Sequence, residues 1–197
     1  YIDFVVGTED GKVGSSTVSG LQATIKATFN QPISETELAT PSAKGYIFKG
    51  YFTEITGGVE VTKSSTNLVA APASDGTSRA TVYARFTAIT FTVEYDGNGA
   101  TGGSTNPSTF TYDKDAILPA NGFTKTGYNF AGWSYGGQTY KVGDNVKNLT
   151  DTAETLTFSA EWTAKTYNVE FNGNYAGAET STLEFTYDSE NNILADA

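Results

Sequence analysis

Apolar and polar residues alternate along most of the chain, with the period of two that is typical of half-buried β-strands. In the clearest segment, Phe91, Val93 and Tyr95 share one face while Thr92 and Glu94 share the other. The same alternation continues in these apolar residues: Ile2, Phe4, Val6, Ile25, Ala27, Phe29, Val82, Ala84, Phe86, Phe110, Tyr112, Leu156, Phe158, Ala160 and Trp162. Threonine is abundant and β-branched, which also favours strands. The pattern predicts a mainly β protein.

Glycine, Asn and Asp gather between the expected strands, as in DGNGATGG at 96–103, where they supply the backbone conformations that tight turns need. Helix signals are few. The segment 34–40 has Ser34 and Glu37 at the spacing of a capping box, and 144–154 is expected to hold another turn or two. The fold class predicted from these patterns is mainly β with minor α (α+β).

The chain repeats itself. The segment TFTVEYDGN at 90–98 returns as TYNVEFNGN at 166–174, an offset of 76 residues. Three further echoes occur in the same order: FTYD at 110–113 and 185–188, VYARFTA at 82–88 with FSAEWTA at 158–164, and GYIFKGY at 45–51 with GYNFAGW at 127–133. Repeats of this length indicate a tandem array of small modules.

We therefore divide the chain into a divergent copy one at 1–88, a well-matched copy two at 89–164 and an incomplete copy three at 165–197. Copy one carries an extra stretch at 13–22, and copy three contains only the first two expected strands.

Composition narrows the function. The 12 basic and 22 acidic residues give a net charge of −10, which disfavours nucleic acid and anionic membrane surfaces as partners. The chain has no Cys and no His, so Ser–His–Asp and Cys–His arrangements and histidine metal sites are excluded. Most carboxylates alternate outward along strands, as Glu94 and Glu161 do. We expect no catalytic activity and no cofactor.

Two special sites remain open. The run from Asp96 to Gly99 is similar to the start of a calcium loop, but the twelfth position is Pro107 where an EF-hand needs Glu. A hairpin turn is the preferred interpretation, with an irregular surface calcium site as the alternative. A Lys–Asn or Lys–Asp isopeptide bond is a second open point that the sequence cannot place.

Several of these motifs together resemble the Listeria–Bacteroides repeat family, the B-repeats of internalin-type bacterial surface proteins. They are VEYDGNG at 93–99, FTYDKDAILPANGF at 110–123, GYNFAGW at 127–133 and FSAEWT at 158–163. Copy one departs from the pattern, with Tyr51 and Phe86 where the family has tryptophan. The resemblance implies tandem β-grasp-like (ubiquitin-like) modules in exported proteins that are often anchored to the cell wall. It also implies stalk, spacer or adhesive roles rather than enzymatic ones.

Trp133 and Trp162, the only tryptophans, are expected to anchor the core of copy two. The other expected core anchors are Tyr128, Phe130, Gly132 and Phe158. The alternative for the tryptophans is a stacking platform for a sugar or a peptide.

Copy three presents an apolar face that a lone hairpin cannot cover. This predicted assembly face consists of Tyr167, Val169, Phe171, Leu183, Phe185 and Tyr187. Either the chain continues and completes the module, which we prefer, or a neighbouring subunit does so by adding strands.

The leading hypothesis is a non-catalytic structural or adhesive repeat region of an extracellular, cell-surface protein associated with the cell wall or surface layer. It would act as a stalk, an adhesin segment or a filament subunit. The alternative is a carbohydrate- or protein-binding module that uses exposed aromatics such as Tyr135, Tyr140 or Tyr175. Expected partners are neighbouring repeats or identical subunits and host or cell-surface glycans or proteins. No apolar run is long enough for membrane insertion.

Overall fold

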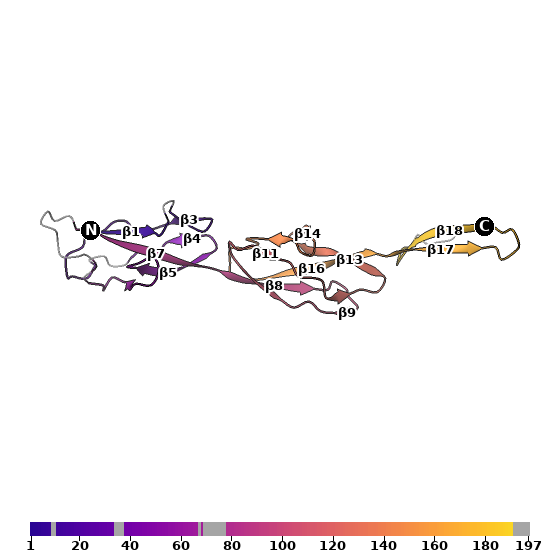
Figure 1. Ribbon diagram of the computed structural model, residues 1–197. Coiled ribbons are helices and arrows are strands. Elements are labelled where there is room, and N and C mark those ends of the chain that lie inside the picture. The colour runs from indigo at the N-terminus through magenta and orange to yellow at the C-terminus, as the bar shows by residue number, and fades with distance from the viewer. Residues whose placement is uncertain (9–10, 34–37, 67, 69–77, 191–197) are drawn as a thin grey trace. The chain divides into compact units, whose positions relative to one another are not determined.

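The fold is described here from a computed structural model of the chain, for residues 1–8, 11–33, 38–66, 68 and 78–190. The described residues form β-strands and connecting turns with no helix (Figure 1). The expectation of helical turns at 144–154 is therefore wrong, because Asn145–Val146 forms a strand instead. The capping-box residues Ser34 and Glu37 lie outside the described residues. Within the described residues there is also no helix that is long and apolar enough to cross a membrane.

Two compact units are present, and they do not coincide with the sequence copies. Unit 1 comprises 1–91, 110–115 and 147–154, so it contains copy one together with two segments of copy two. Unit 2 comprises 92–109, 116–146 and 155–197.

The sheet of unit 1 has seven strands in the order β1-β7-β5-β4-β3-β2, with β6 paired to β5. The strands are β1 Ile2–Val6, β2 Lys12–Val13, β3 Ser16–Ser19, β4 Ser42–Ala43, β5 Tyr46–Phe52, β6 Glu60–Val61 and β7 Ala80–Ala88. β1 and β7 are parallel, and the other pairs are antiparallel. The buried core beneath the sheet consists of Ile2, Phe4, Ile25, Ile33, Tyr51, Val61, Val82 and Ala84.

The second sheet has five strands in the order β10-β8-β16-β13-β14, and most of its residues belong to unit 2. The strands are β8 Thr90–Asp96, β10 Ser108–Thr111, β13 Tyr128–Tyr135, β14 Gln138–Tyr140 and β16 Thr155–Ala164. β8 and β16 are parallel, and β13 is antiparallel to both β16 and β14.

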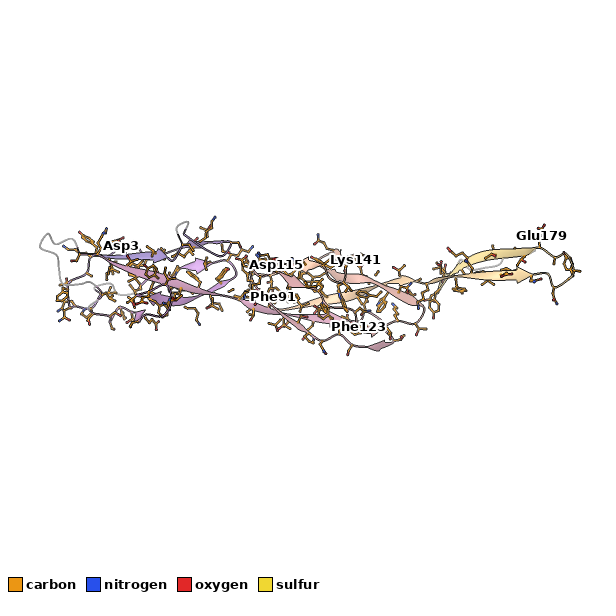
Figure 2. All side chains as sticks on the ribbon, in the orientation of Figure 1. Asp3, Phe91, Asp115, Phe123, Lys141 and Glu179 are labelled. Atoms are coloured by element: carbon orange, nitrogen blue, oxygen red, sulfur yellow. The ribbon has the colours of Figure 1, made fainter. Side chains whose placement is uncertain are left out.

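Three short ribbons complete the fold. Antiparallel pairs join β9 Gly102–Gly103 with β12 Phe123–Thr124, β11 Ala116–Ile117 with β15 Asn145–Val146, and β17 Thr166–Asn172 with β18 Thr180–Thr186. Phe123 lies on β12 (Figure 2). The centroid of its ring is 6.2 Å from that of Trp133.

Each of the two sheets has a β-bulge, and the two bulges lie at equivalent positions of copy one and copy two. The pairing of β5 with β7 shifts register between Phe48 and Gly50, and the pairing of β13 with β16 shifts between Phe130 and Gly132. A Cβ atom on Gly132 would lie 2.6 Å from the carbonyl oxygen of Tyr140, so the bulge requires glycine there. The residue after each bulge is buried in the core of its unit. This residue is Tyr51 in unit 1, with 2% of its surface exposed, and Trp133 in unit 2, with 0% exposed.

Candidate assembly sites

Of the expected core anchors of copy two, Phe130 packs against Trp133, which has no exposed surface, whereas Tyr128 is half-buried and packs against Tyr187 instead. The indole Nε1 of Trp133 donates to the carbonyl oxygen of Pro119 at 3.2 Å. Phe130 makes edge contacts with the rings of both Trp133 and Trp162, and Phe158 is also fully buried. Trp162 is half-buried, and its Nε1 donates to the carbonyl oxygen of Gly97 at 2.9 Å. Trp133 therefore has no free face on which a sugar could stack.

Two of the three tyrosines considered for ligand binding pack against the ring of Phe158, and the third lies in a turn. Tyr135 stacks on Phe158 with ring centroids 4.7 Å apart and planes 11° apart, and Tyr140 lies 5.5 Å from the same ring. Both are half-buried. Tyr175 is 72% exposed and lies in the turn between β17 and β18. These three residues therefore form no common binding surface.

The run from Asp96 to Gly99 is a turn tied to β16. Asn98 adopts a left-handed φ of 46°, and its backbone N–H donates to Asp96 Oδ1 at 3.0 Å. The Asn98 Nδ2 group donates to the carbonyl oxygen of Ala160 at 2.8 Å. Within the described residues, no group of three or more acidic side chains is placed to hold a metal ion.

The predicted assembly face lies on the hairpin of β17 and β18. The strand register places Tyr167 opposite Phe185 and Val169 opposite Leu183, and the first pair of rings is stacked at 6.0 Å. Glu179 precedes β18 near the turn of this hairpin (Figure 2). Among the described strands, β17 and β18 pair only with each other. Tyr167 and Leu183 are 50% and 48% exposed, whereas Val169, Phe171 and Phe185 are half-buried, so the face is partly open.

A further contact in unit 1 did not emerge from the sequence. The carboxylate of Asp113 is surrounded by hydrogen-bond donors, and we call this group the Asp113 clasp. Asp113 Oδ2 accepts from the backbone N–H of Ser15 at 2.7 Å and from the Tyr46 hydroxyl at 2.8 Å. Its Oδ1 accepts from Ser15 Oγ at 2.6 Å and from Asn148 Nδ2 at 2.9 Å. The backbone N–H of Asp113 donates in return to Asn148 Oδ1 at 2.6 Å.

The residue before Asp113 packs against a glycine. Gly45 has a φ of +75°, and a Cβ atom at this position would overlap the ring of Tyr112. The rings of Tyr46 and Tyr112 meet edge to face at 5.7 Å. Two backbone bonds of 3.0 Å complete the contact, from Ile89 N–H to the Gly45 carbonyl and from Tyr112 N–H to the Ile89 carbonyl. The Tyr112–Asp113 pair of copy two thus docks on the Gly45–Tyr46 pair of copy one.

The extra stretch of copy one contributes to this clasp. Strands β2 and β3 form a hairpin whose turn carries Gly14 and Ser15. A Cβ atom on Gly14 would overlap the Tyr46 hydroxyl and the Asp113 carboxylate, so the turn approaches closely because it has glycine there. The insertion therefore supplies the two Ser15 hydrogen bonds.

The clasp changes the acidity of two of its members. Partial burial acts to raise the pKa of Asp113, but hydrogen bonds from Asn148, Ser15 and Tyr46 outweigh it and hold that pKa well below its ordinary value. Burial and the hydrogen bond to Asp113 raise the pKa of Tyr46 to about 12. The carboxylate is therefore charged and the phenol is neutral over the physiological range.

Comparison with known proteins agrees with the repeat pattern. The family model of the Listeria–Bacteroides repeat domain matches residues 9–85 and 91–161. A protein of Evansella cellulosilytica described as a "Putative Gly-rich membrane protein" is 30% identical over 152 residues, which cover 74% of this chain. The matched part is only 17% of that relative's length. No solved structure gives a significant match.

Proposed function

Because the chain belongs to the Listeria–Bacteroides repeat family, we propose that it is a non-catalytic, structural or adhesive repeat region of an extracellular cell-surface protein. The observation that carries the proposal is the docking of Tyr112–Asp113 of one copy on Gly45–Tyr46 of the copy before it. A protein whose role is to connect or space other parts needs such contacts between its repeats. The membrane-protein description of the Evansella cellulosilytica relative is consistent with a place at the cell surface.

We further propose that the modules are 1–88, 89–164 and 165–197, and that they are variants of the β-grasp whose described residues contain no helix. The support comes from the sheet of copy two, in which the first and last strands, β8 and β16, are parallel neighbours at the centre. Copy one also has a parallel pair, β1 and β7, although β1 lies at the edge of its sheet.

For copy three we propose completion by the same polypeptide. In copy two the ring of Tyr95, on β8, packs 4.7 Å from Trp133, which belongs to the second half of the repeat. The hairpin of β17 and β18 requires an equivalent second half. Sedimentation equilibrium of the 197-residue chain tests this, since a monomer is expected and a stable oligomer lost on Leu183→Asp would indicate completion by a neighbouring subunit.

The cell-surface proposal is tested on intact cells of the organism that carries the gene. Antibodies raised against the folded chain should label unpermeabilised cells, and brief protease treatment of these cells should remove the label. A cytoplasmic marker protein serves as the control for lysis. Labelling that appears only after permeabilisation would contradict the proposal.

A further inference from the structure

Three corners of the chain have the same local structure. They are the segments Thr28–Asn30, Thr111–Asp113 and Thr186–Asp188, with the sequences TFN, TYD and TYD. Their last residues have left-handed φ angles of 55°, 61° and 58°. In each corner the carbonyl of the threonine accepts from the N–H three residues later, at 3.2, 3.2 and 3.3 Å. Asn and Asp are the non-glycine residues that best tolerate this conformation.

The corner of copy two is docked in unit 1, as described above, and the corner of copy three is docked in unit 2 in the same way. A Cβ atom on Gly127, which has a φ of +77°, would overlap the ring of Tyr187. The rings of Tyr128 and Tyr187 meet edge to face at 5.6 Å, and the Tyr128 hydroxyl donates to Asp188 Oδ2 at 3.2 Å. Lys165 takes the place of Ile89, with backbone bonds of 2.9 Å to the Gly127 carbonyl and 2.8 Å from the Tyr187 N–H.

The corner of copy one is undocked among the described residues. Phe29 is 48% exposed, compared with 5% for Tyr112 and 38% for Tyr187 in the two docked corners. The ring of Phe29 contacts no other aromatic ring of the described residues, and Asn30 is exposed beside it. In both docked corners the ring rests on a glycine and meets a second tyrosine ring, and Phe29 has neither contact among the described residues. An exposed phenylalanine at such a corner marks a docking surface without its partner.

We propose that Phe29–Asn30 is a docking corner whose partner is the Gly-Tyr turn of another repeat of this family, one that precedes copy one in the same polypeptide. In both docked cases the corner belongs to the later copy and the Gly-Tyr turn to the earlier one, which fixes the direction. Phenylalanine presents the same ring as tyrosine. The Oδ1 atom of Asn accepts from a tyrosine hydroxyl as a carboxylate oxygen does. These contacts between repeats do not depend on where the protein is located.

The first test asks whether a Phe-Asn corner can dock at all. The double variant Tyr112→Phe with Asp113→Asn places the corner of copy one where a Gly-Tyr turn is present. Amide hydrogen exchange by NMR should show Ile89 and Tyr112 protected to within about tenfold of the wild type. Tyr112→Ala should lower this protection by a further factor of ten or more, with Lys165 and Tyr187 unchanged as internal controls. Equal loss in the double variant and in Tyr112→Ala would overturn the proposal.

The second test supplies the missing partner. A second copy of residues 89–167 is joined directly ahead of Tyr1. Ile2 and Val169 hold equivalent positions in the strand register, and in the extended chain Ile2 follows the added Lys165 at the same distance along the chain as Val169 follows the original one. In the extended chain the Phe29 amide should become protected, and Phe29→Ala should lower that protection. In the original chain Phe29→Ala should change little.

Two results would count against the proposal in this test. If Phe29→Ala has the same effect with and without the added repeat, the corner has no such partner. If the original chain sediments as an oligomer that Phe29→Ala converts to a monomer, the partner is a second copy of the chain rather than a preceding repeat. Neither result would bear on the cell-surface role.

Discussion

The Asp113 clasp of unit 1 has a counterpart in unit 2, where Tyr187–Asp188 docks on Gly127–Tyr128. The two clasps share the same central contacts but differ in the number of additional contacts around them. Both have a glycine of positive φ under a tyrosine ring, an edge-to-face tyrosine pair and a tyrosine hydroxyl that donates to an aspartate. In unit 1, Ser15 and Asn148 also donate to the carboxylate. The linking residue, whose backbone bonds to both the glycine and the docked tyrosine, is Ile89, and it is buried. In unit 2 the linking residue is the exposed Lys165.

This difference separates the part of the contact that defines docking from the part that strengthens it. The Gly-Tyr turn and the Tyr-Asp corner occur in both clasps, so they are the minimal contact. The Ser15 bonds come from an insertion of copy one, and the Asn148 bonds come from the later part of copy two. The clasp of unit 1 should therefore be the more stable of the two.

The largest effect is expected where a side chain is forced into the docked ring. Gly45→Ala adds a Cβ atom that overlaps Tyr112, whereas Gly57→Ala, at a φ of +70°, meets nothing within 4 Å. Both carry the cost of a left-handed alanine, so the difference between them isolates the clasp. Gly45→Ala should lower the free energy of unfolding of unit 1 by about 1–3 kcal/mol more than Gly57→Ala, measured by urea titration.

The matched pair in unit 2 is Gly127→Ala and Gly137→Ala, with φ angles of +77° and +79°. Tyr187 is more exposed than Tyr112 and has more room to move aside. The difference between these two variants should therefore be about 1 kcal/mol or less. A larger penalty in unit 2 than in unit 1 would reverse the ranking of the clasps.

Removal of each aspartate should rank next. Asp113→Ala leaves Ser15, Tyr46 and Asn148 without their acceptor, which should cost about 1–2 kcal/mol because the site is only half-buried. Asp188→Ala removes one hydrogen bond from Tyr128 and should cost about 0.5 kcal/mol. Equal costs, measured by thermal unfolding, would show that the Ser15 and Asn148 bonds add nothing.

Acid should weaken the clasp of unit 1. The pKa of Asp113 is lower in the folded protein than its ordinary value of about 4, so its contribution is fully present above that value. The contribution is lost as the pH falls from about 4 toward the folded pKa. Asp113→Asn should remove this part of the acid dependence, so that its stability falls less steeply between about pH 5 and pH 2. Parallel pH curves for the variant and the wild type would contradict the assignment.

The smallest effect is expected at the periphery of the clasp. Lys44 and Asp151 form an ion pair of 3.6 Å, but both side chains are largely exposed to solvent. Lys44→Ala should change the stability of unit 1 by about 0.5 kcal/mol or less, and high salt should abolish the difference. A loss comparable to that of Asp113→Ala would place this pair at the centre of the clasp.

The sequence predicted the parts of the fold that depend on local pattern. The alternation of Phe91, Val93 and Tyr95 lies on β8 with all three side chains buried, and the repeated motifs identified the family. The helical turns at 144–154 were predicted wrongly. Asn145–Val146 pairs with Ala116–Ile117, and Asn148 has a left-handed φ of 52° that ends any helix there. Periodicity over so short a segment cannot reveal a pairing partner elsewhere in the chain.

The clasp was missed for a different reason. FTYD and the Gly-Tyr pair were both recognised as recurring motifs, but each was interpreted within its own copy, as a strand and as a core segment. Tyr46 and Asp113 are 67 residues apart, and nothing local shows that they meet. The available signal was that Tyr-Asp and Gly-Tyr recur together, which indicates a contact that recurs with the repeat.

The central claim is that a Tyr-Asp corner docks on the Gly-Tyr turn of the repeat before it. A nuclear Overhauser spectrum of the unmodified chain tests it most directly. We predict cross-peaks between the ring protons of Tyr112 and the Hα protons of Gly45, and between those of Tyr187 and Gly127, because each glycine lies against its ring. If neither cross-peak is present while those within the core around Trp133 are, the repeats do not dock in this way.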